Sequence, residues 1–172
     1  MSAYFDALTE AMTTFAKHPK ALVVGQQTLY DGQRMHASLA GVSMEKRIEM
    51  PVAENFQMGF CTGLSLEGYI PLCIFPRIDF LVIAMDQLCN HLDKIAEMSD
   101  FRPKVIIRTS IGAKRPLDPG PQHTQNHVQA LRGMLRRIPI EHLTDESQIE
   151  GAYKWASAAD HSSILVENME FY

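Results

Sequence analysis

Short apolar runs alternate with amphipathic segments along the whole chain, and this alternation limits the possible folds more than any other feature. Strands are expected at residues 21–24, 47–50, 69–75, 104–108, 138–142 and 163–167. Helices are expected at residues 4–15, 54–66, 80–95 and 145–159, and in a segment that follows His123 and ends at Leu135. Several strands are continuously apolar, and helices separate them, which predicts a parallel sheet covered on both faces. The predicted fold class is therefore α/β, a three-layer α/β/α domain with a mainly parallel sheet of about six strands.

The length of the chain favours one domain. With 172 residues, of which 46% are hydrophobic, residues 1–172 are expected to form a single domain with its own core. Residues 30–46 mix glycines, serines and charges without a clear period, so a long loop is expected there, and such loops are often functional.

Charge and cysteine usage exclude several classes of protein. The net charge is −4 and the charged residues are scattered, so nucleic acid is not an expected partner. Cys61, Cys73 and Cys89 lie in apolar stretches at irregular spacing, which indicates reduced core thiols in a cytoplasmic protein. The first 17 residues lack a continuous apolar region, so neither a signal peptide nor a membrane span is expected.

Six segments then occur in the order and spacing of the signatures of one enzyme superfamily. They are RIEMPVAEN at 47–55 followed by Gly59 and Gly63, EGYIP at 67–71, DF at 79–80 with MDQ at 85–87, VIIRT at 105–109, QHTQ at 122–125 and LVEN at 165–168. Together they resemble the pyrimidine-binding domain of the transketolase-like thiamine-diphosphate superfamily. The chain is most similar to the beta subunits of the 2-oxo acid (pyruvate and branched-chain) dehydrogenases, and the resemblance implies their thiamine-diphosphate-binding fold of the pyrimidine type.

Two departures from the beta subunits bear on what the chain could do. Those subunits continue into a carboxy-terminal domain, whereas this sequence stops at Tyr172. The superfamily holds its metal with a Gly-Asp-Gly motif and a later Asn, and no Gly-Asp-Gly occurs here. The resemblance therefore implies that a partner chain of the alpha type binds the diphosphate and the Mg²⁺, and that this chain is catalytically incomplete alone.

Glu54 is the expected catalytic and cofactor-binding residue. The resemblance places it beside the pyrimidine ring of thiamine diphosphate, where a carboxyl group shares a proton with the ring nitrogen and so favours the imino form that activates the cofactor. The alternative is that Glu54 only favours the start of a helix, where a carboxylate interacts well with free amide groups.

Three further side chains follow from the resemblance. Phe80 is expected to stack on the pyrimidine ring, although an aromatic residue at helical spacing can equally belong to the core. His123 is expected to bind a substrate carboxylate or to move protons, with an ordinary loop histidine as the alternative. Arg77, which precedes the helix of Phe80, is expected to be a structural or rim residue and is a weaker candidate for binding a substrate anion. His127 lies four residues after His123, but no third ligand matches, so no metal site is expected.

The implied function is the pyrimidine-side subunit of a split thiamine-diphosphate enzyme that decarboxylates a 2-oxo acid and transfers the acyl group. Gly59 and Gly63 share a helix face and are expected to mediate self-association within a heterotetramer, or else to pack tightly on their own sheet. A split transketolase-type enzyme or a simple 2-oxo acid decarboxylase is a second possibility. A noncatalytic scaffold or regulatory subunit with the same fold is the third.

Overall fold

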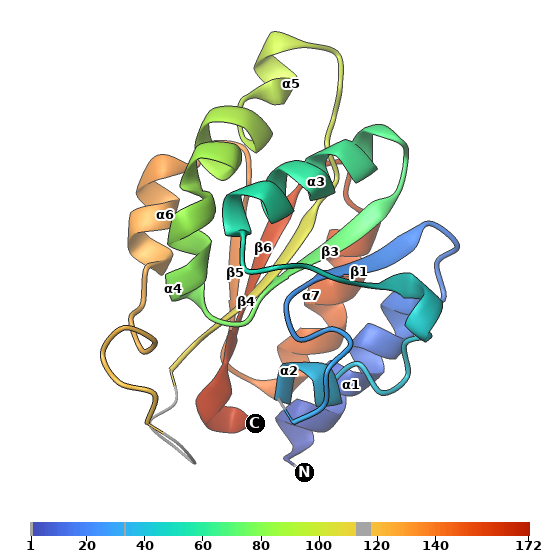
Figure 1. The fold of residues 1–172 in the computed structure, drawn as a ribbon, viewed down its shortest axis with the longest axis vertical. Helices are drawn as coiled ribbons and strands as arrows, with labels where there is room; N and C mark the ends of the chain where they lie inside the picture. The colour runs from blue at the N-terminus through green and yellow to red at the C-terminus, as the bar shows by residue number, and fades with distance from the viewer. Residues whose placement is uncertain (1, 33, 113–117) are drawn as a thin grey trace.

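The computed structural model describes residues 2–32, 34–112 and 118–172, and its central element is a parallel sheet (Figure 1). The strands are β1 (Ala21–Gly25), β2 (Arg47–Glu49), β3 (Ile70–Phe75), β4 (Ile106–Ile111), β5 (Ile140–Leu143) and β6 (Ser163–Asn168). Their order is β2-β1-β3-β4-β6-β5, and every neighbouring pair is parallel. The predictions of an α/β fold and of a mainly parallel sheet are confirmed.

Helices cover both faces of the sheet. They are α1 (Ala3–Ala16), α2 (Arg34–Ala37), α3 (Glu54–Leu66), α4 (Ile78–Leu81), α5 (Ile95–Met98), α6 (Val128–Met134) and α7 (Glu146–Ala158). Short 3₁₀ turns lie at Met44–Lys46, Val82–Ala84 and Met169–Phe171, and a π-helical segment, η3, spans Asp86–Leu92. Helices α1 and α7 pack side by side on one face, whereas α3, α4 and α6 lie on the other (Figure 1).

Two of the predicted helices differ in detail from the observed ones. The helix expected at 80–95 is a series of short α, 3₁₀ and π segments between Ile78 and Met98. This region packs on α3, where Asn55 Oδ1 accepts a hydrogen bond from the backbone N–H of Gln87 at 3.3 Å. A side chain that inserts in this way changes the helical ladder. The helix that was expected to follow His123 begins at Val128, and residues 30–46 contain the short α2 within their loop.

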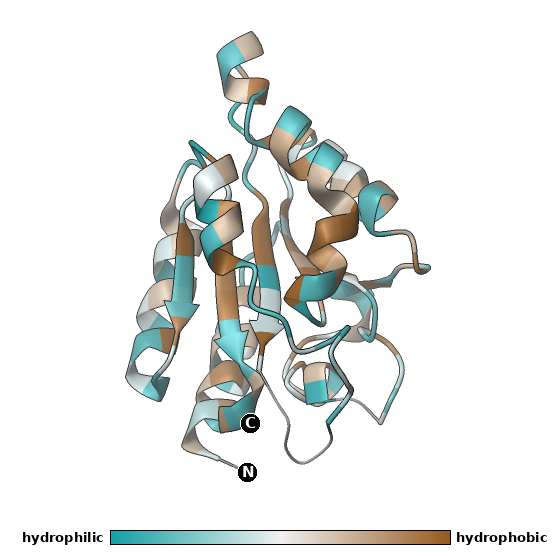
Figure 2. Cartoon of the chain, turned by 90° about the vertical axis from the view of Figure 1, so that its left-hand side faces the viewer, coloured by the Kyte–Doolittle hydropathy of each residue, from teal (hydrophilic) through white to brown (hydrophobic). Residues whose placement is uncertain are grey.

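The sheet separates two hydrophobic cores. Strand β3 is buried at all six positions, because helices cover both of its faces. The three cysteines are free, with Cys61 and Cys73 buried and Cys89 half-buried. Figure 2 shows hydrophobic residues in the middle of the strands and hydrophilic residues where several strands end. None of the helices among the described residues is long and apolar enough to cross a membrane.

Candidate functional site

Polar side chains gather where the parallel strands end. Gln26 follows β1, Glu49 is the last residue of β2, Arg77 follows β3, and Asn168 ends β6. Glu54 begins the helix that follows β2. In a parallel sheet these carboxyl ends lie along one edge, which is the usual place for ligands in α/β proteins. The candidate site is therefore this edge of the sheet.

The chain turns sharply after β1. Gly25 has a φ of +154°, and a Cβ at this position would lie 2.4 Å from the carbonyl oxygen of Ile74 on the neighbouring strand. Gln27 has a φ of +63°, which is uncommon for a residue with a side chain. The turn therefore requires glycine at its first position and a strained residue two positions later, and such strain persists only where the surroundings hold it.

Glu49 holds this turn from the adjacent strand. Its carboxylate accepts hydrogen bonds from the backbone N–H groups of Gln27, Thr28 and Leu29 at 2.8, 2.7 and 2.9 Å, and from Thr28 Oγ1 at 2.8 Å. Burial raises the pKa of Glu49, but these four hydrogen bonds outweigh it and leave the pKa below its ordinary value. Glu49 is thus an anion that fixes the loop.

Glu54 lies at the first position of α3, with 3% of its surface exposed. Its Oε1 accepts a hydrogen bond from Gln26 Nε2 at 3.3 Å, so its contact reaches across to the turn after β1. One turn further along α3, the buried Gln57 donates from Nε2 to the carbonyl oxygen of Ile74 at 2.8 Å. Gln57 Oε1 has no hydrogen-bond partner among the described residues.

The structure brings Phe80 and His123 together. Their ring centroids are 5.4 Å apart and the rings meet edge to face at 70°. The Nδ1 atom of His123 is buried without a hydrogen-bond partner among residues 2–32, 34–112 and 118–172. Phe80 itself is half-buried. The two residues therefore form an aromatic pair that carries an unused ring nitrogen.

Arg77 and Asp79 fasten the loop that carries His123. Arg77 Nη1 donates to the carbonyl oxygens of Gly112 and His123, both at 2.8 Å, while burial lowers the pKa of the guanidinium and Asp79 opposes this change. Asp79 Oδ1 accepts from Nε2 of Gln125 at 3.0 Å and from its backbone N–H at 3.3 Å. Arg77 therefore has a structural role here, in addition to the anion binding predicted for it. Residues 113–117 lie outside the residues that the structure describes.

His127 lies close to the carboxylate of Asp79. Its Nε2 lies 3.9 Å from Asp79 Oδ1, so it contacts the same carboxylate that anchors the loop. Among the described residues, no group of three or more His, Cys, Asp or Glu side chains is arranged to hold a metal ion.

The sequence predicted no role for Gln26, Glu49 or Asp79, although Glu49 and Asp79 lie within two of the six signatures. Each of the three has a contact partner more than 20 residues away, which a local pattern does not reveal. One signal was available, because Gln26 and Glu49 lie directly at the ends of expected parallel strands, where polar residues commonly serve a site.

The two glycines of α3 face different surroundings. A Cβ at Gly59 would lie 3.1 Å from Gln87 Oε1, so Gly59 allows close packing within the chain, whereas Gly63 has nothing within 4 Å. Beside Gly63 the helix exposes Phe56, which is 61% exposed and stacks on Phe60 with ring centroids 6.2 Å apart, and Leu66, which is 57% exposed. Helix α3 thus has one face packed on its own chain and one open apolar face.

Comparison with known proteins gives a family profile and a set of distant relatives. The profile described as "Transketolase, pyrimidine binding domain" matches residues 1–171. A chloroplastic pyruvate dehydrogenase E1 component subunit beta-3 of Oryza sativa subsp. japonica is 25% identical over 98% of this chain and 44% of its own length. The mitochondrial subunit beta of Caenorhabditis elegans is 26% identical over 97% of this chain and 48% of its own length. The chain therefore spans less than half the length of these two relatives.

Solved structures share the fold. A split-gene transketolase, described as an inactive beta4 tetramer, superposes with a TM-score of 0.75 at 19% identity, over 98% of this chain and 51% of the other. Transketolase from Campylobacter jejuni superposes with a TM-score of 0.74 at 16% identity, over 95% of this chain and 25% of the other. At these sequence identities the superpositions show a shared fold alone.

Proposed function

The chain belongs to the transketolase pyrimidine-binding domain family, and on this premise we propose that it supplies the pyrimidine side of a thiamine-diphosphate-dependent enzyme acting on a 2-oxo acid. The reaction proposed is decarboxylation followed by acyl transfer. The observation that carries the proposal is Glu54, a buried carboxylate at the start of α3 on the ligand-binding edge of the sheet. We assign the diphosphate and Mg²⁺ to an alpha-type partner chain, because this sequence has no Gly-Asp-Gly motif.

The residues at this edge fit the pyrimidine part of the cofactor. Glu54 offers a carboxylate in a largely dry position, where sharing a proton with a ring nitrogen is favoured. Phe80 offers a half-buried aromatic ring to a flat heterocycle, and the unpartnered Nδ1 of His123 can donate to or accept from a polar ligand. Thiamine diphosphate, when bound, supplies the carbon nucleophile that attacks the 2-oxo group.

In this mechanism the protein's own groups hold and move protons. Glu54 would hold the pyrimidine part of the cofactor and share its carboxyl proton with a ring nitrogen, which would supply general acid–base catalysis. His123 binds the substrate carboxylate or moves a proton near it, and Arg77 and Asp79 keep the loop of His123 in place. Among the described residues, Arg77 makes hydrogen bonds through Nη1 alone, so its Nε and Nη2 groups can donate to a substrate anion.

Self-association through α3 is part of the proposal. The apolar face of this helix is open at Gly63 and carries Phe56 and Leu66, and an exposed apolar patch on a soluble chain commonly marks an interface. We propose that two copies pair there and that two partner chains complete a heterotetramer. Gly59 contributes indirectly, because it allows α3 to pack closely on Gln87.

A split transketolase-type enzyme is the second candidate. A split-gene transketolase shares the fold of this chain, and this likeness suggests the candidate by analogy alone. A noncatalytic subunit with the same fold is the third candidate. Substrate tests separate the first two candidates, because one predicts turnover of 2-oxo acids and the other predicts transfer between sugars.

The decisive experiment replaces Glu54 in the complex assembled with its diphosphate-binding partner. Glu54→Gln keeps the size of the side chain but cannot exchange a carboxyl proton, so turnover and thiazolium-proton exchange should fall by about 2–4 orders of magnitude. Glu67→Gln makes the same change at the exposed far end of α3 and should leave both rates unchanged. Light scattering should show that both complexes assemble normally. Equal rates for wild type and Glu54→Gln would contradict a catalytic role.

Binding of thiamine diphosphate by the isolated chain tests whether the partner chain supplies the diphosphate and Mg²⁺ contacts. If the diphosphate and Mg²⁺ contacts belong to the partner, the chain alone should bind thiamine diphosphate weakly, since charged contacts supply much of the polar anchoring. Calorimetry that shows tight, magnesium-dependent binding by this chain alone would contradict the assignment to a partner.

A further inference from the structure

Gln26 lies between the strained turn after β1 and the carboxylate of Glu54. We infer that Gln26 is a positioning residue for Glu54: the turn held by Glu49 aims the Gln26 amide at Glu54 Oε1 and so fixes the carboxylate toward the cofactor. This inference rests on the proposed function, and nothing in the six sequence signatures marks Gln26.

The first support is the unfavourable backbone conformation of this turn. Gly25 leaves no room for a Cβ beside Ile74, and Gln27 adopts a left-handed conformation that is unfavourable for a residue with a side chain. Gln26 is held between these two positions. An ordinary surface turn requires neither feature. The strain therefore indicates that the side chain of Gln26 must point in a particular direction.

The second support is the way in which Glu49 stabilises the turn. Three consecutive backbone N–H groups, from Gln27 to Leu29, point at its carboxylate, together with Thr28 Oγ1. Thr28 is fully buried, so the backbone after Gln26 has little freedom to move. The carboxylate of Glu49 therefore fixes the backbone next to Gln26, and the hydrogen bond of 3.3 Å to Glu54 fixes the position of the Gln26 side-chain amide.

The third support is the chemistry of the pair. A neutral amide donates to a carboxylate without titrating, so Gln26 orients Glu54 and does not compete with it for the proton that the mechanism uses. Oε1 of Glu54 accepts from Gln26, while Oε2 receives no hydrogen bond from the described residues. A carboxylate that is held by one oxygen and free at the other suits a proton shared with a ligand.

The contact itself is tested on the isolated chain by nuclear magnetic resonance. The side-chain amide signals of Gln26 should shift, and exchange faster with solvent, in Glu54→Ala than in wild type, because Oε1 is removed. The amide signals of Gln129, which is exposed on α6, serve as the internal control. Gln26 signals that do not respond to the loss of Glu54 would overturn the inference.

The consequence is tested in the assembled complex. Gln26→Leu removes the donor and should lower kcat and thiazolium-proton exchange by roughly 10- to 100-fold, the scale of a small misplacement of a reacting group, with KM for the 2-oxo acid nearly unchanged. Gln26→Glu places two carboxylates together and should move the pH profile of the exchange reaction to higher pH. Gln129→Leu should behave as wild type.

The outcomes distinguish the inference from the proposed function. If Glu54→Gln leaves exchange unaffected, the proposed function fails. If Glu54→Gln abolishes exchange while Gln26→Leu retains the wild-type rate, Glu54 keeps its role and the positioning role of Gln26 is overturned. If Gln26→Leu does not fold, the Gln26 amide response in Glu54→Ala still decides the contact, and the pH profile of Gln26→Glu decides its consequence.

Discussion

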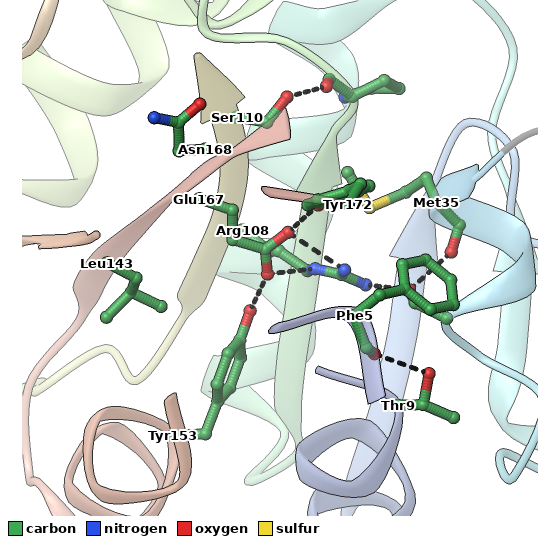
Figure 3. Close-up of polar contacts among 12 residues, drawn as sticks. Phe5, Thr9, Met35, Arg108, Ser110, Leu143, Tyr153, Glu167, Asn168 and Tyr172 are labelled. Carbon is green, nitrogen blue, oxygen red and sulfur yellow. Dashed lines mark hydrogen bonds and ion pairs between the residues drawn. The ribbon is translucent and has the colours of Figure 1, made fainter. Parts of the chain in front are cut away.

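Two polar clusters in this molecule differ in how completely the protein satisfies them. On the α1/α7 face, Arg108 and Glu167 are fully buried and form a bidentate pair, with Arg108 Nε and Nη2 at 2.7 and 3.0 Å from the two carboxylate oxygens. Tyr153 and Tyr172 donate their hydroxyl groups to the same carboxylate, and Arg108 Nη1 donates to Ser38 Oγ (Figure 3). Every charged group in this cluster has its partners inside the chain.

The cluster at the edge of the sheet is left incomplete. Glu54 has one hydrogen bond from Gln26, while Gln57 Oε1 and His123 Nδ1 are buried without partners among the described residues. Buried polar atoms are nearly always paired in folded proteins, so unpaired ones require an explanation. The complete pairing of the first cluster assigns it to the scaffold, and the unpaired atoms of the second support our proposal that this cluster binds a ligand.

The pKa shifts in the buried cluster agree with a scaffold role. Burial alone would lower the pKa of Arg108, but the adjacent Glu167 raises it above its ordinary value, so the guanidinium stays charged. Burial, and then the charge of Glu167, raise the pKa of Tyr153 well above its ordinary value, so this hydroxyl remains a donor. Breaking a buried ion pair of this kind costs stability, because removal of one partner leaves the charge of the other buried without a counter-charge.

The largest expected effect comes from breaking the buried pair. Arg108→Met should destabilise the chain by about 3–5 kcal/mol, because Glu167 then keeps a buried charge without its cation. Glu54→Gln should change the free energy of unfolding by less than about 0.5 kcal/mol, since the amide oxygen of the new side chain can still accept the one long hydrogen bond from Gln26. Urea unfolding of both variants gives the comparison directly.

The double variant sharpens this test. Arg108→Met with Glu167→Leu removes both charges and should recover part of the stability lost in Arg108→Met, because no buried charge remains. A double variant as unstable as the sum of the two single variants would show that the charges act independently. If Glu54→Gln destabilised the chain as much as Arg108→Met, Glu54 would contribute to stability like the buried pair, and the two clusters would not differ in role.

Most of the fold could be predicted from the sequence, because its signal is local. The six residues of β3 form a continuous apolar run, and all of them are buried between two helical layers. Such runs separated by helices predict a parallel sheet without any knowledge of contacts. The helix at 80–95 was predicted less well, since its π-helical segment adjoins a contact between Asn55 and Gln87, 32 residues apart in the chain.

Residues of the candidate site could be predicted where a motif contained them, whereas contacts between distant residues could not. Glu54, Phe80 and His123 follow from the resemblance, and the structure adds that Phe80 and His123 touch. The contact of Gln26 with Glu54 joins residues 28 apart, and that of Asp79 with Gln125 joins residues 46 apart. No period or short motif carries such information, so these roles required the three-dimensional arrangement.

A smaller effect is expected from the two tyrosines that bind Glu167. Tyr153→Phe should destabilise the chain by about 1–3 kcal/mol, because the carboxylate loses a donor at a position that water does not reach. Tyr172→Phe should also destabilise the chain, because its hydroxyl group donates to the same buried carboxylate and burial raises the pKa of that hydroxyl well above its ordinary value. Tyr30→Phe is a matched control at a residue that is 70% exposed. Thermal unfolding ranks the three variants, and equal costs for all three would contradict a saturated cluster.

The smallest effect concerns Glu49, which is fully hydrogen-bonded yet belongs to the edge of the site. Its four hydrogen bonds hold its pKa below the ordinary value in the folded chain. A depressed pKa means that the carboxylate contributes stability above its unfolded pKa of about 4.3, and that this contribution is lost as the pH falls through the lower folded value. Since Glu49 is partly exposed, the contribution should be roughly 1 kcal/mol or less.

Urea unfolding between about pH 3 and pH 6 should therefore show a flatter pH dependence for Glu49→Gln than for wild type. Glu45→Gln, at an exposed position on the preceding turn, should follow the wild type. If Glu49 also sets the direction of Gln26, thiazolium-proton exchange should fall in Glu49→Gln at neutral pH, where the fold is intact. A loss of stability without a loss of exchange would assign Glu49 to the scaffold together with Arg108 and Glu167.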